Sequence, residues 1–274
     1  MEAEILQYLE SIRNPFLTTI METITICAES AFLLAIISII YWCLNKDIAI
    51  KLASAILINA VLTATIKGIV KKPRPFELGI VKPLRVETAI GYAFPSGHTS
   101  TATAFWGSAV TVFKNNSMLI FSIIIVILTG ISRLYLGVHW PTDVLAGVFL
   151  GIISVFISDL VWKNKKYLLE GSIIILVISV FFSTHVASAA AALFGIVYGR
   201  NLEMKYVNFV IAGNYKYQIK KVIIGMAGIA IIYFGLDKVM VDTTITVMIK
   251  YALVMLWITF FAPYLFKKYL VASQ

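Results

Sequence analysis

The chain has 274 residues, of which 60% are hydrophobic and 14% are charged, and its mean hydropathy is +0.90. An ordinary soluble domain is about half apolar and a quarter charged, so this composition excludes a soluble globular protein and indicates a polytopic membrane protein. The formal net charge is +9, but the lysines cluster at the ends of apolar runs, which is typical of membrane topology and does not indicate nucleic acid. Only two cysteines are present, so neither a disulfide framework nor a zinc site is indicated.

The N-terminal segment is expected to lie along the membrane surface. Its first ten residues hold three glutamates and no lysine or arginine, so a secretory signal is not indicated and the segment is expected in the mature protein. Apolar residues recur at helical spacing over residues 3–16, which predicts an interfacial amphipathic helix within a first segment, 1–22. The first span is expected at about residues 25–44. Glu29, near its start, is interpreted as a helix-end acid that reaches the interface, with a functional role as the alternative.

Four further spans follow in the predicted catalytic core, residues 23–166. The second span is expected from about Ile48 to Val70, and a polar stretch follows in which two prolines hold the chain extended around Arg74. A loop then leads to Phe94. The next spans are expected at about residues 96–113, 118–136 and 140–162, each close to the roughly 20 residues that cross the hydrocarbon layer.

Counting these crossings brings the polar residues together. The second and fourth spans end, and the third and fifth begin, on the same face of the membrane. Scattered charges would not be gathered in this way. The polar residues expected at that one level are Lys67, Arg74, Ser96, His98, Arg133, His139 and Asp143.

A histidine and an aspartate among these polar residues indicate the chemistry that they could carry out. His139 and Asp143 are four residues apart, and Pro141 between them suits the first turn of a helix, so both side chains can share one helical face. An acid on one ring nitrogen fixes the tautomer and leaves the other nitrogen free to attack. The guanidinium of Arg133 suits a phosphate oxygen or a carboxylate. The residues therefore indicate nucleophilic chemistry on an anion.

The C-terminal extension, residues 167–274, has no motif to which chemistry can be assigned. Residues 168–198 are too long for one span and short for two. A split near residues 183–185 places the basic residues on consistent sides and is favoured, which gives about nine spans in an all-α transmembrane bundle. The polar level is expected to face away from the cytoplasm of a bacterial cell membrane. The loops on the opposite side carry Lys46, Lys51, Lys114 and Lys163 to Lys166.

Three stretches carry a resemblance to a known family. They are KGIVKKPRP from Lys67, PSGH from Pro95, and SR at Ser132 followed by His139 and Asp143. Together they resemble the three-part signature of the type 2 phosphatidic acid phosphatase (PAP2) superfamily, with every motif position matched in order. The resemblance covers about residues 25–162. It implies a metal-independent integral membrane lipid phosphatase that needs no cofactor.

The resemblance also implies a role for each motif residue. His139 is expected to attack phosphorus and form a phosphohistidine, with Asp143 holding its ring. His98 is expected to protonate the leaving group and then to help activate water. The remaining motif residues are expected to bind the phosphate oxygens, three through side-chain charge and two through backbone N–H groups at a helix N-terminus. They are Lys67, Arg74, Arg133, Ser96 and Gly97.

Several alternatives stay open at this point. The substrate is expected to be a lipid phosphomonoester or diphosphate in the bilayer, with undecaprenyl diphosphate favoured among several lipid phosphates, and residues 76–94 are expected to select it. Lys71 and Lys72 are expected to meet lipid headgroups. The rival functions are a lipid phosphotransferase with a lipid or sugar acceptor and a non-catalytic transporter; a haloperoxidase is disfavoured because those proteins are soluble. The oligomeric state is left open.

Overall fold

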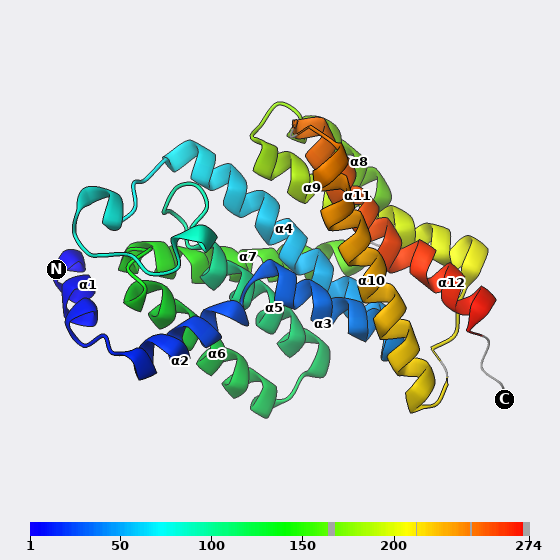
Figure 1. Ribbon diagram of the computed structural model, residues 1–274, viewed down its shortest axis with the longest axis horizontal. Helices are drawn as coiled ribbons and strands as arrows, with labels where there is room; N and C mark the ends of the chain where they lie inside the picture. The colour runs from blue at the N-terminus through cyan, green and yellow to red at the C-terminus, as the bar shows by residue number, and fades with distance from the viewer. Residues whose placement is uncertain (164–167, 212, 242, 271–274) are drawn as a thin grey trace. The chain divides into compact units, whose positions relative to one another are not determined.

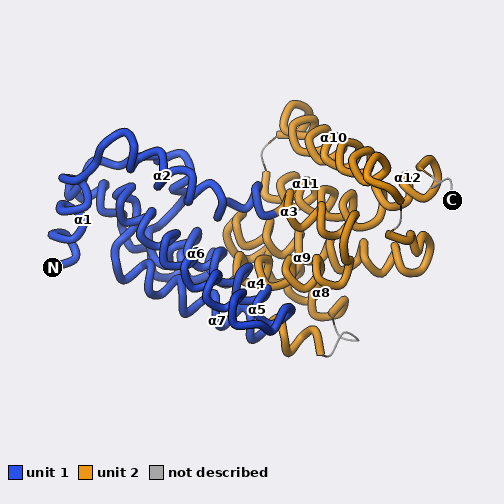
Figure 2. Tube along the Cα trace, turned by 90° about the horizontal axis from the view of Figure 1, so that it is seen from below, with its two compact units in different colours: residues 1–33, 62–157 blue, residues 34–61, 158–274 orange. Residues whose placement is uncertain are grey.

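The computed structural model describes residues 1–163, 168–211, 213–241 and 243–270, and all the regular secondary structure in them is helical (Figure 1). The expected all-α class is therefore confirmed. The chain divides into two compact units, coloured separately in Figure 2: Met1–Leu33 with Leu62–Ile157, and Leu34–Val61 with Ser158–Gln274. The predicted segment boundaries stay predictions, and the one at residues 166–167 lies outside the described residues.

Four whole α-helices and parts of three others contribute to the described residues of the first unit. The polar loop between α4 and α5 carries two short 3-10 helices, η1 and η2, and belongs to this unit as well. The elements are α1 (Glu2–Ser11), α2 (Pro15–Ile26), the start of α3 (Ser30–Cys43), the end of α4 (Lys46–Val70), η1 (Phe76–Leu78), η2 (Val86–Thr88), α5 (Gly97–Phe113), α6 (Asn116–Tyr135) and most of α7 (Pro141–Lys163).

The N-terminal region differs from the single helix expected over residues 3–16. α1 ends at Ser11, and α2 begins at Pro15, whose fixed φ suits a first helical turn. The side chain of Asn14 caps α2 by accepting the N–H of Leu17 at 3.0 Å. The expected first span is likewise not one straight helix, because α2 and α3 meet at a bend of 51°.

Among the described residues, five helical segments are long and apolar enough to cross a membrane, and the bent pair α2 and α3 makes up to six. The five are α4, α6, α7, α10 (Tyr215–Val239) and the segment Thr244–Tyr269. The expected break within residues 168–198 is confirmed, since α8 (Leu168–Ser179) ends before α9 (Thr184–Leu202) begins. The total of about nine crossings stays a prediction, because α5, α8 and α9 fall outside this length and hydropathy range.

Close packing fixes α5 against α7 in the first unit. A Cβ atom at Gly147 of α7 would lie 2.8 Å from the backbone oxygen of Ser96, and one at Gly151 would lie 2.4 Å from Cβ of Thr103. Two small residues four positions apart let helix backbones approach closely in a membrane. α4 joins the same bundle, because the hydroxyl oxygens of Thr63 and Ser100 lie 3.2 Å apart. The start of α5 is therefore held beside the start of α7.

The second unit is built around α9, which packs against α8 and α11 (Thr244–Leu256). Its buried charged groups have partners within the unit. Lys46 lies 2.8 Å from the fully buried carboxylate of Glu203, and Lys221, also fully buried, donates to the carbonyl oxygen of Trp42 at 2.8 Å. Trp42 in turn donates its indole N–H to the carbonyl oxygen of Ile258 at 2.8 Å. These contacts account for buried charge in this unit without a ligand.

Candidate active site

The turn between α6 and α7 sets His139 and Asp143 beside one another. Gly137 in this turn has a φ of +73°, a backbone conformation that glycine adopts at low cost. Asp143 lies in the first turn of α7 and accepts the backbone N–H of Trp140 at 2.8 Å through Oδ2, which caps the helix. The same oxygen lies 3.5 Å from Nδ1 of His139. The His-Asp pair expected from the sequence is therefore present as neighbours, at a distance slightly longer than a good hydrogen bond.

The backbone joins this turn to the start of α5. The N–H of Ser96, the N-cap residue of α5, donates to the carbonyl oxygen of Asp143 at 2.9 Å. Its hydroxyl oxygen lies 2.9 Å from that of Thr99. Gly97 and His98 occupy the first helical positions, where backbone N–H groups lack partners within the helix. The helix start that carries His98 therefore faces the turn that carries His139.

Arg74 sits between the polar loop and His139. Its guanidinium is buried and donates to the carbonyl oxygens of Gly91 at 2.9 Å and Val138 at 2.7 Å, and its Nη1 lies 3.4 Å from Nε2 of His139. Burial lowers the pKa of Arg74 from its ordinary value. Lys67, at the end of α4, donates to the carbonyl oxygen of Tyr92. The two cations of the first motif thus hold the loop in place as well as facing the site.

Arg133 has spare hydrogen-bonding capacity deep in the protein. It is fully buried, and its Nη1 donates to the hydroxyl of Thr25 at 3.1 Å, but its Nε and Nη2 have no partner. Nε2 of His98 is likewise buried without a partner. Buried donors without acceptors are rare in folded proteins and ask for an explanation. An anion bound between these side chains would satisfy them.

The electrostatic setting of His139 favours a neutral ring. Only 2% of the residue is exposed. Burial first, and then the positive charges of Arg133, Arg74 and Lys67, hold the pKa of His139 well below its ordinary value. An unprotonated imidazole keeps a lone pair for attack.

Lys72 is a site residue that the sequence pattern does not indicate. The sequence predicts that it meets lipid headgroups together with Lys71, but its Nζ lies 2.9 Å from Oδ1 of the fully buried Asp143 and 2.8 Å from the hydroxyl of Thr142. It also lies 5.5 Å from the centre of the Trp140 ring. The only sequence signal was its place inside the first motif, five residues after the motif lysine.

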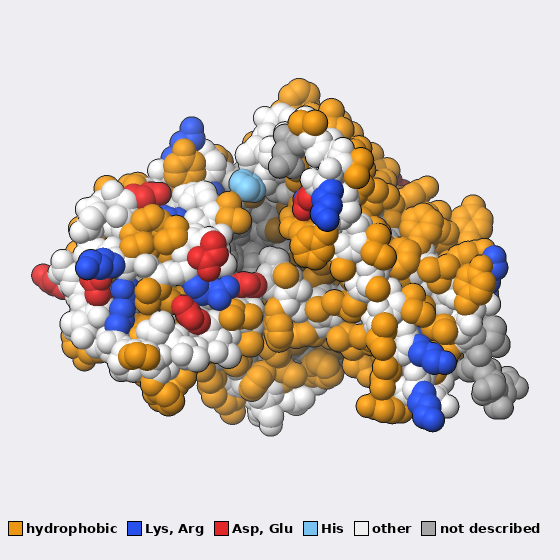
Figure 3. Space-filling model, in the orientation of Figure 1, with side chains coloured by type: hydrophobic (Ala, Val, Ile, Leu, Met, Phe, Trp, Pro, Cys, Tyr) orange, Lys and Arg blue, Asp and Glu red, His pale blue; other side chains and the backbone are white. Residues whose placement is uncertain are grey.

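The described residues contain no group of three or more His, Cys, Asp or Glu side chains arranged to hold a metal ion. The candidate site instead gathers cations around a histidine pair. Its surroundings are charged too, since Figure 3 shows acidic and basic side chains gathered on the face of the first unit that carries the polar loop.

Two family models match the chain. The model of the PAP2 superfamily matches residues 48–167, and that of the PAP2 superfamily phosphatase transmembrane extension matches residues 187–274. Phosphatidylglycerophosphatase B of Bacillus subtilis is 30% identical over 159 residues, which cover 53% of this chain and 75% of that protein. The chain belongs to the PAP2 superfamily.

Other relatives within the PAP2 superfamily extend the comparison. An undecaprenyl-diphosphatase of Sulfolobus acidocaldarius is 35% identical over 42% of this chain and 55% of its own length. The crystal structure of a transmembrane PAP2 type phosphatidylglycerolphosphate phosphatase from Bacillus subtilis has a TM-score of 0.51 and 28% identity, covering 60% of this chain and 85% of that one. The matched region spans 55% of the length of the Sulfolobus acidocaldarius protein and 75% of the length of phosphatidylglycerophosphatase B.

Proposed function

We propose that this PAP2 protein is an integral membrane phosphatase that hydrolyses a lipid phosphomonoester or diphosphate through a phosphohistidine, without a metal ion. The observation that supports this most directly is the set of buried, unpartnered N–H donors on Arg133, whose charge, after burial, helps to hold the pKa of His139 low. A cationic pocket with unmet donors suits a phosphate dianion. A neutral imidazole beside it suits attack on phosphorus.

In the proposed first step, Nε2 of His139 attacks phosphorus. The N–P bond forms as the bond from phosphorus to the leaving oxygen breaks, and His98 supplies the proton that this oxygen takes up. Asp143, facing Nδ1 of His139 at 3.5 Å, offsets the positive charge that develops on the ring. In the second step, His98 accepts a proton from water as that water attacks the phosphohistidine. Free phosphate leaves, and His139 returns to its neutral form.

The phosphate oxygens are proposed to be held by charge and by backbone donors. Arg133 supplies two N–H groups that have no other partner. The first backbone N–H groups of α5, at Gly97 and His98, supply an anion site of the kind found at helix N-termini, while the N–H of Ser96, also expected to bind phosphate, donates to the carbonyl oxygen of Asp143. Lys67 and Arg74 add positive charge and hold the polar loop through its carbonyl oxygens. These interactions strengthen as negative charge gathers on the equatorial oxygens in the transition state.

The favoured substrate class is an isoprenoid diphosphate such as undecaprenyl diphosphate. Curated relatives named undecaprenyl-diphosphatase include the Sulfolobus acidocaldarius protein and BcrC of Bacillus subtilis, which is 37% identical over 31% of this chain. A relative named phosphatidylglycerophosphatase keeps glycerophospholipid phosphates as the alternative substrates.

We place the site on the face of the bacterial cell membrane away from the cytoplasm, in a bundle of about nine crossings. This rests on the lysines of the opposite loops, Lys46, Lys51, Lys114 and Lys163. The further lysines at 165 and 166 lie outside the described residues.

The test is phosphate release from purified full-length chain in detergent, with a panel of isoprenoid and glycerolipid phosphates. The wild type is expected to release phosphate with no added acceptor, and the His139→Ala variant is expected to release none while keeping the same elution volume and melting temperature. A wild type that releases phosphate only when a lipid or sugar acceptor is present would support the phosphotransferase instead. A His139→Ala variant with full activity would overturn the mechanism.

A further inference from the structure

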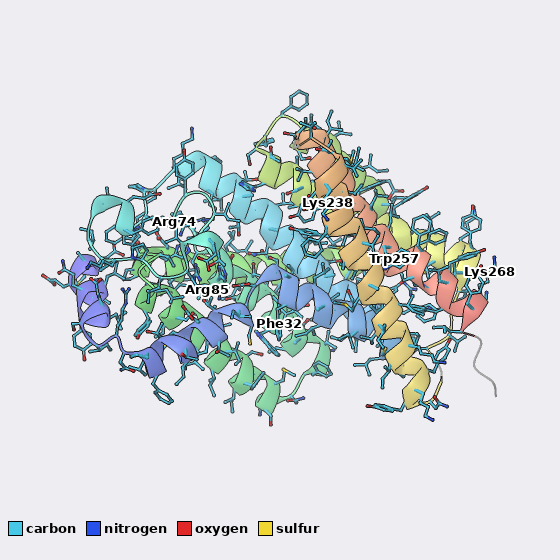
Figure 4. The ribbon with its side chains drawn as sticks, viewed as in Figure 1. Phe32, Arg74, Arg85, Lys238, Trp257 and Lys268 are labelled. Atoms are coloured by element: carbon cyan, nitrogen blue, oxygen red, sulfur yellow. The ribbon has the colours of Figure 1, made fainter. Side chains whose placement is uncertain are left out.

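Arg85 is a second arginine of the polar loop. It lies immediately before η2, close to the bend between α2 and α3 (Figure 4). Its Nη2 donates to Oε1 of Glu29, at that bend, over 2.6 Å. Its backbone has a φ of +52°, in the left-handed region that side chains other than glycine and asparagine rarely adopt. Arg85 therefore combines an uncommon backbone conformation with a short contact to Glu29.

The pairing with Glu29 leaves part of Arg85 unused. Its Nε is buried and has no hydrogen-bond partner. The other carboxylate near this nitrogen, that of Glu87, lies 3.9 Å away on a side chain that is 70% exposed. A surface ion pair alone would leave this N–H in water. The Nε–H of Arg85 is instead buried without an acceptor, and an acceptor on a bound ligand would explain this.

Arg85 adjoins the site through the same bend. Glu29 follows Thr25 by four residues, and the hydroxyl of Thr25 accepts Nη1 of Arg133 at 3.1 Å. The charges of Arg85 and Glu29 both act on Arg133, and that of Arg85 acts on His98 as well. Arg85 and Arg133 each have a buried, unpartnered Nε. The unmet donors thus lie on two arginines, and the charge of one of them, Arg85, acts on the residue proposed to protonate the leaving group.

We propose that Arg85, held in place by Glu29, binds the phosphate that remains on the lipid when the substrate is a diphosphate; this rests on the proposed function. His139 attacks the terminal phosphorus, the N–P bond forms, and the bond from that phosphorus to the bridging oxygen breaks. The lipid monophosphate leaves with the electron pair on the former bridging oxygen, which takes a proton from His98. Arg85 offsets the charge of this leaving phosphate.

The proposal makes Arg85 a determinant of substrate class. When the substrate is a lipid monophosphate, the leaving group is the lipid alcohol. This alcohol carries no phosphate that Arg85 could bind. Hydrolysis of the monophosphate uses the groups already proposed to hold a single phosphate, which are Lys67, Arg74, Arg133 and the start of α5, without Arg85. The loop of residues 76–94, which is expected to select the lipid, would then distinguish diphosphates from monophosphates.

The experiment compares two substrates with the same tail, farnesyl diphosphate and farnesyl monophosphate, by phosphate release from the full chain in detergent. We expect Arg85→Gln to lower the ratio of kcat/KM for diphosphate over monophosphate by roughly tenfold or more, since a charge-assisted hydrogen bond is lost. Glu29→Gln, which frees Arg85 to move, is expected to lower the ratio in the same direction by less. The matched control is Lys82→Gln, which removes the same charge from an exposed side chain of the same loop and is expected to keep the wild-type ratio.

The outcomes separate this proposal from the proposed function. A wild type that releases no phosphate from either compound, or from other lipid phosphates, overturns the proposed function. A wild type active on the monophosphate alone, or an Arg85→Gln protein that loses the same factor on both compounds, overturns the role of Arg85 and leaves the proposed function standing. If Arg85→Gln does not fold, Arg85→Lys is measured instead. It keeps the charge and lacks the Nε–H, and an unchanged ratio in it overturns the proposal.

Discussion

Lys72 and Asp143 form an ion pair beside His139, the proposed nucleophile. Nζ of Lys72 lies 2.9 Å from Oδ1 of Asp143, and Oδ2 of Asp143 lies 3.5 Å from Nδ1 of His139. Oδ2 also accepts the backbone N–H of Trp140. The buried carboxylate of Asp143 therefore contacts a lysine, caps the start of α7 and faces a histidine. Lys72 stabilises its negative charge and limits how it can turn, so Lys72 acts on His139 through Asp143.

The first prediction concerns this ion pair. Lys72→Met should leave Asp143 buried without its cation, so that it takes up a proton and no longer supports the imidazolium. We expect kcat to fall roughly tenfold or more, as for other residues that orient a catalytic group, with little change in KM. Lys72→Arg should restore most of the activity. Lys71→Gln, an exposed neighbour, is the control. A Lys72→Met protein with wild-type kcat would show that Asp143 does not need the lysine.

The second prediction concerns pH. Burial and three nearby cations hold the pKa of His139 low, so its neutral, nucleophilic form persists as the pH falls below the ordinary histidine value of about 6.5. The acid limb of kcat/KM that belongs to His139 should therefore lie below that pH. In Arg74→Gln one of the repelling charges is gone, so the pKa of His139 should rise and the acid limb should move to higher pH. The measurement is a pH profile of kcat/KM for both proteins; a limb that does not move, or moves down, contradicts the electrostatic account.

The third prediction concerns Arg133. Because its Nε and Nη2 are unpartnered and are proposed to hold phosphate oxygens, Arg133→Lys should keep a charge but lose the forked donors. We expect kcat/KM to fall roughly 100-fold or more, as when an oxyanion donor is removed. Inhibition by vanadate, a phosphate mimic, should weaken in parallel. Thr25→Val, which removes the internal acceptor of Arg133 and the hydroxyl contact with Ser132 but leaves Arg133 itself unchanged, should cost less. Wild-type vanadate inhibition in Arg133→Lys would exclude the proposed contact.

The fourth prediction concerns helix packing. A methyl group at Gly151 would lie 2.4 Å from Cβ of Thr103 and 2.7 Å from the backbone oxygen of Ser100, so α5 and α7 must move apart. We expect Gly151→Ala to lower the free energy of unfolding by about 1–3 kcal/mol and to lower kcat, since the same helices carry His98 and Asp143. Gly171→Ala is the matched control, because a Cβ there meets nothing within 4 Å. Melting temperatures in detergent compare the two; equal values would contradict tight packing.

Much of the framework could be predicted from the sequence because it depends on local signals. Apolar runs mark helices at each expected span, and the break before α9 follows from a run too long for one crossing. The gathering of the motif residues follows from counting crossings. The roles given to them stay predictions. The bend between α2 and α3 was not predicted, because the residues between these helices include no proline or glycine that would mark a break.

The contacts of single charged residues could not be predicted in the same way. Lys72 and Arg85 reach Asp143 and Glu29 across 71 and 56 positions of the chain. No periodicity links residues so far apart, and the path of an irregular loop decides which cation meets which acid. Glu29 was interpreted as a helix-end acid at the interface, while the structure pairs it with Arg85.

The backbone hydrogen bond from Ser96 to Asp143 has a consequence for how this protein can change over evolution. It ties the start of α5 to the start of α7 without using any side chain, so their spacing survives most substitutions around them. The polar loop is joined to other parts of the first unit at separate points: to α4 through Lys67, to the turn before α7 through Arg74, and to the bend between α2 and α3 through Arg85. Substitutions in the polar loop can therefore change which lipid is bound while the reacting groups keep their alignment.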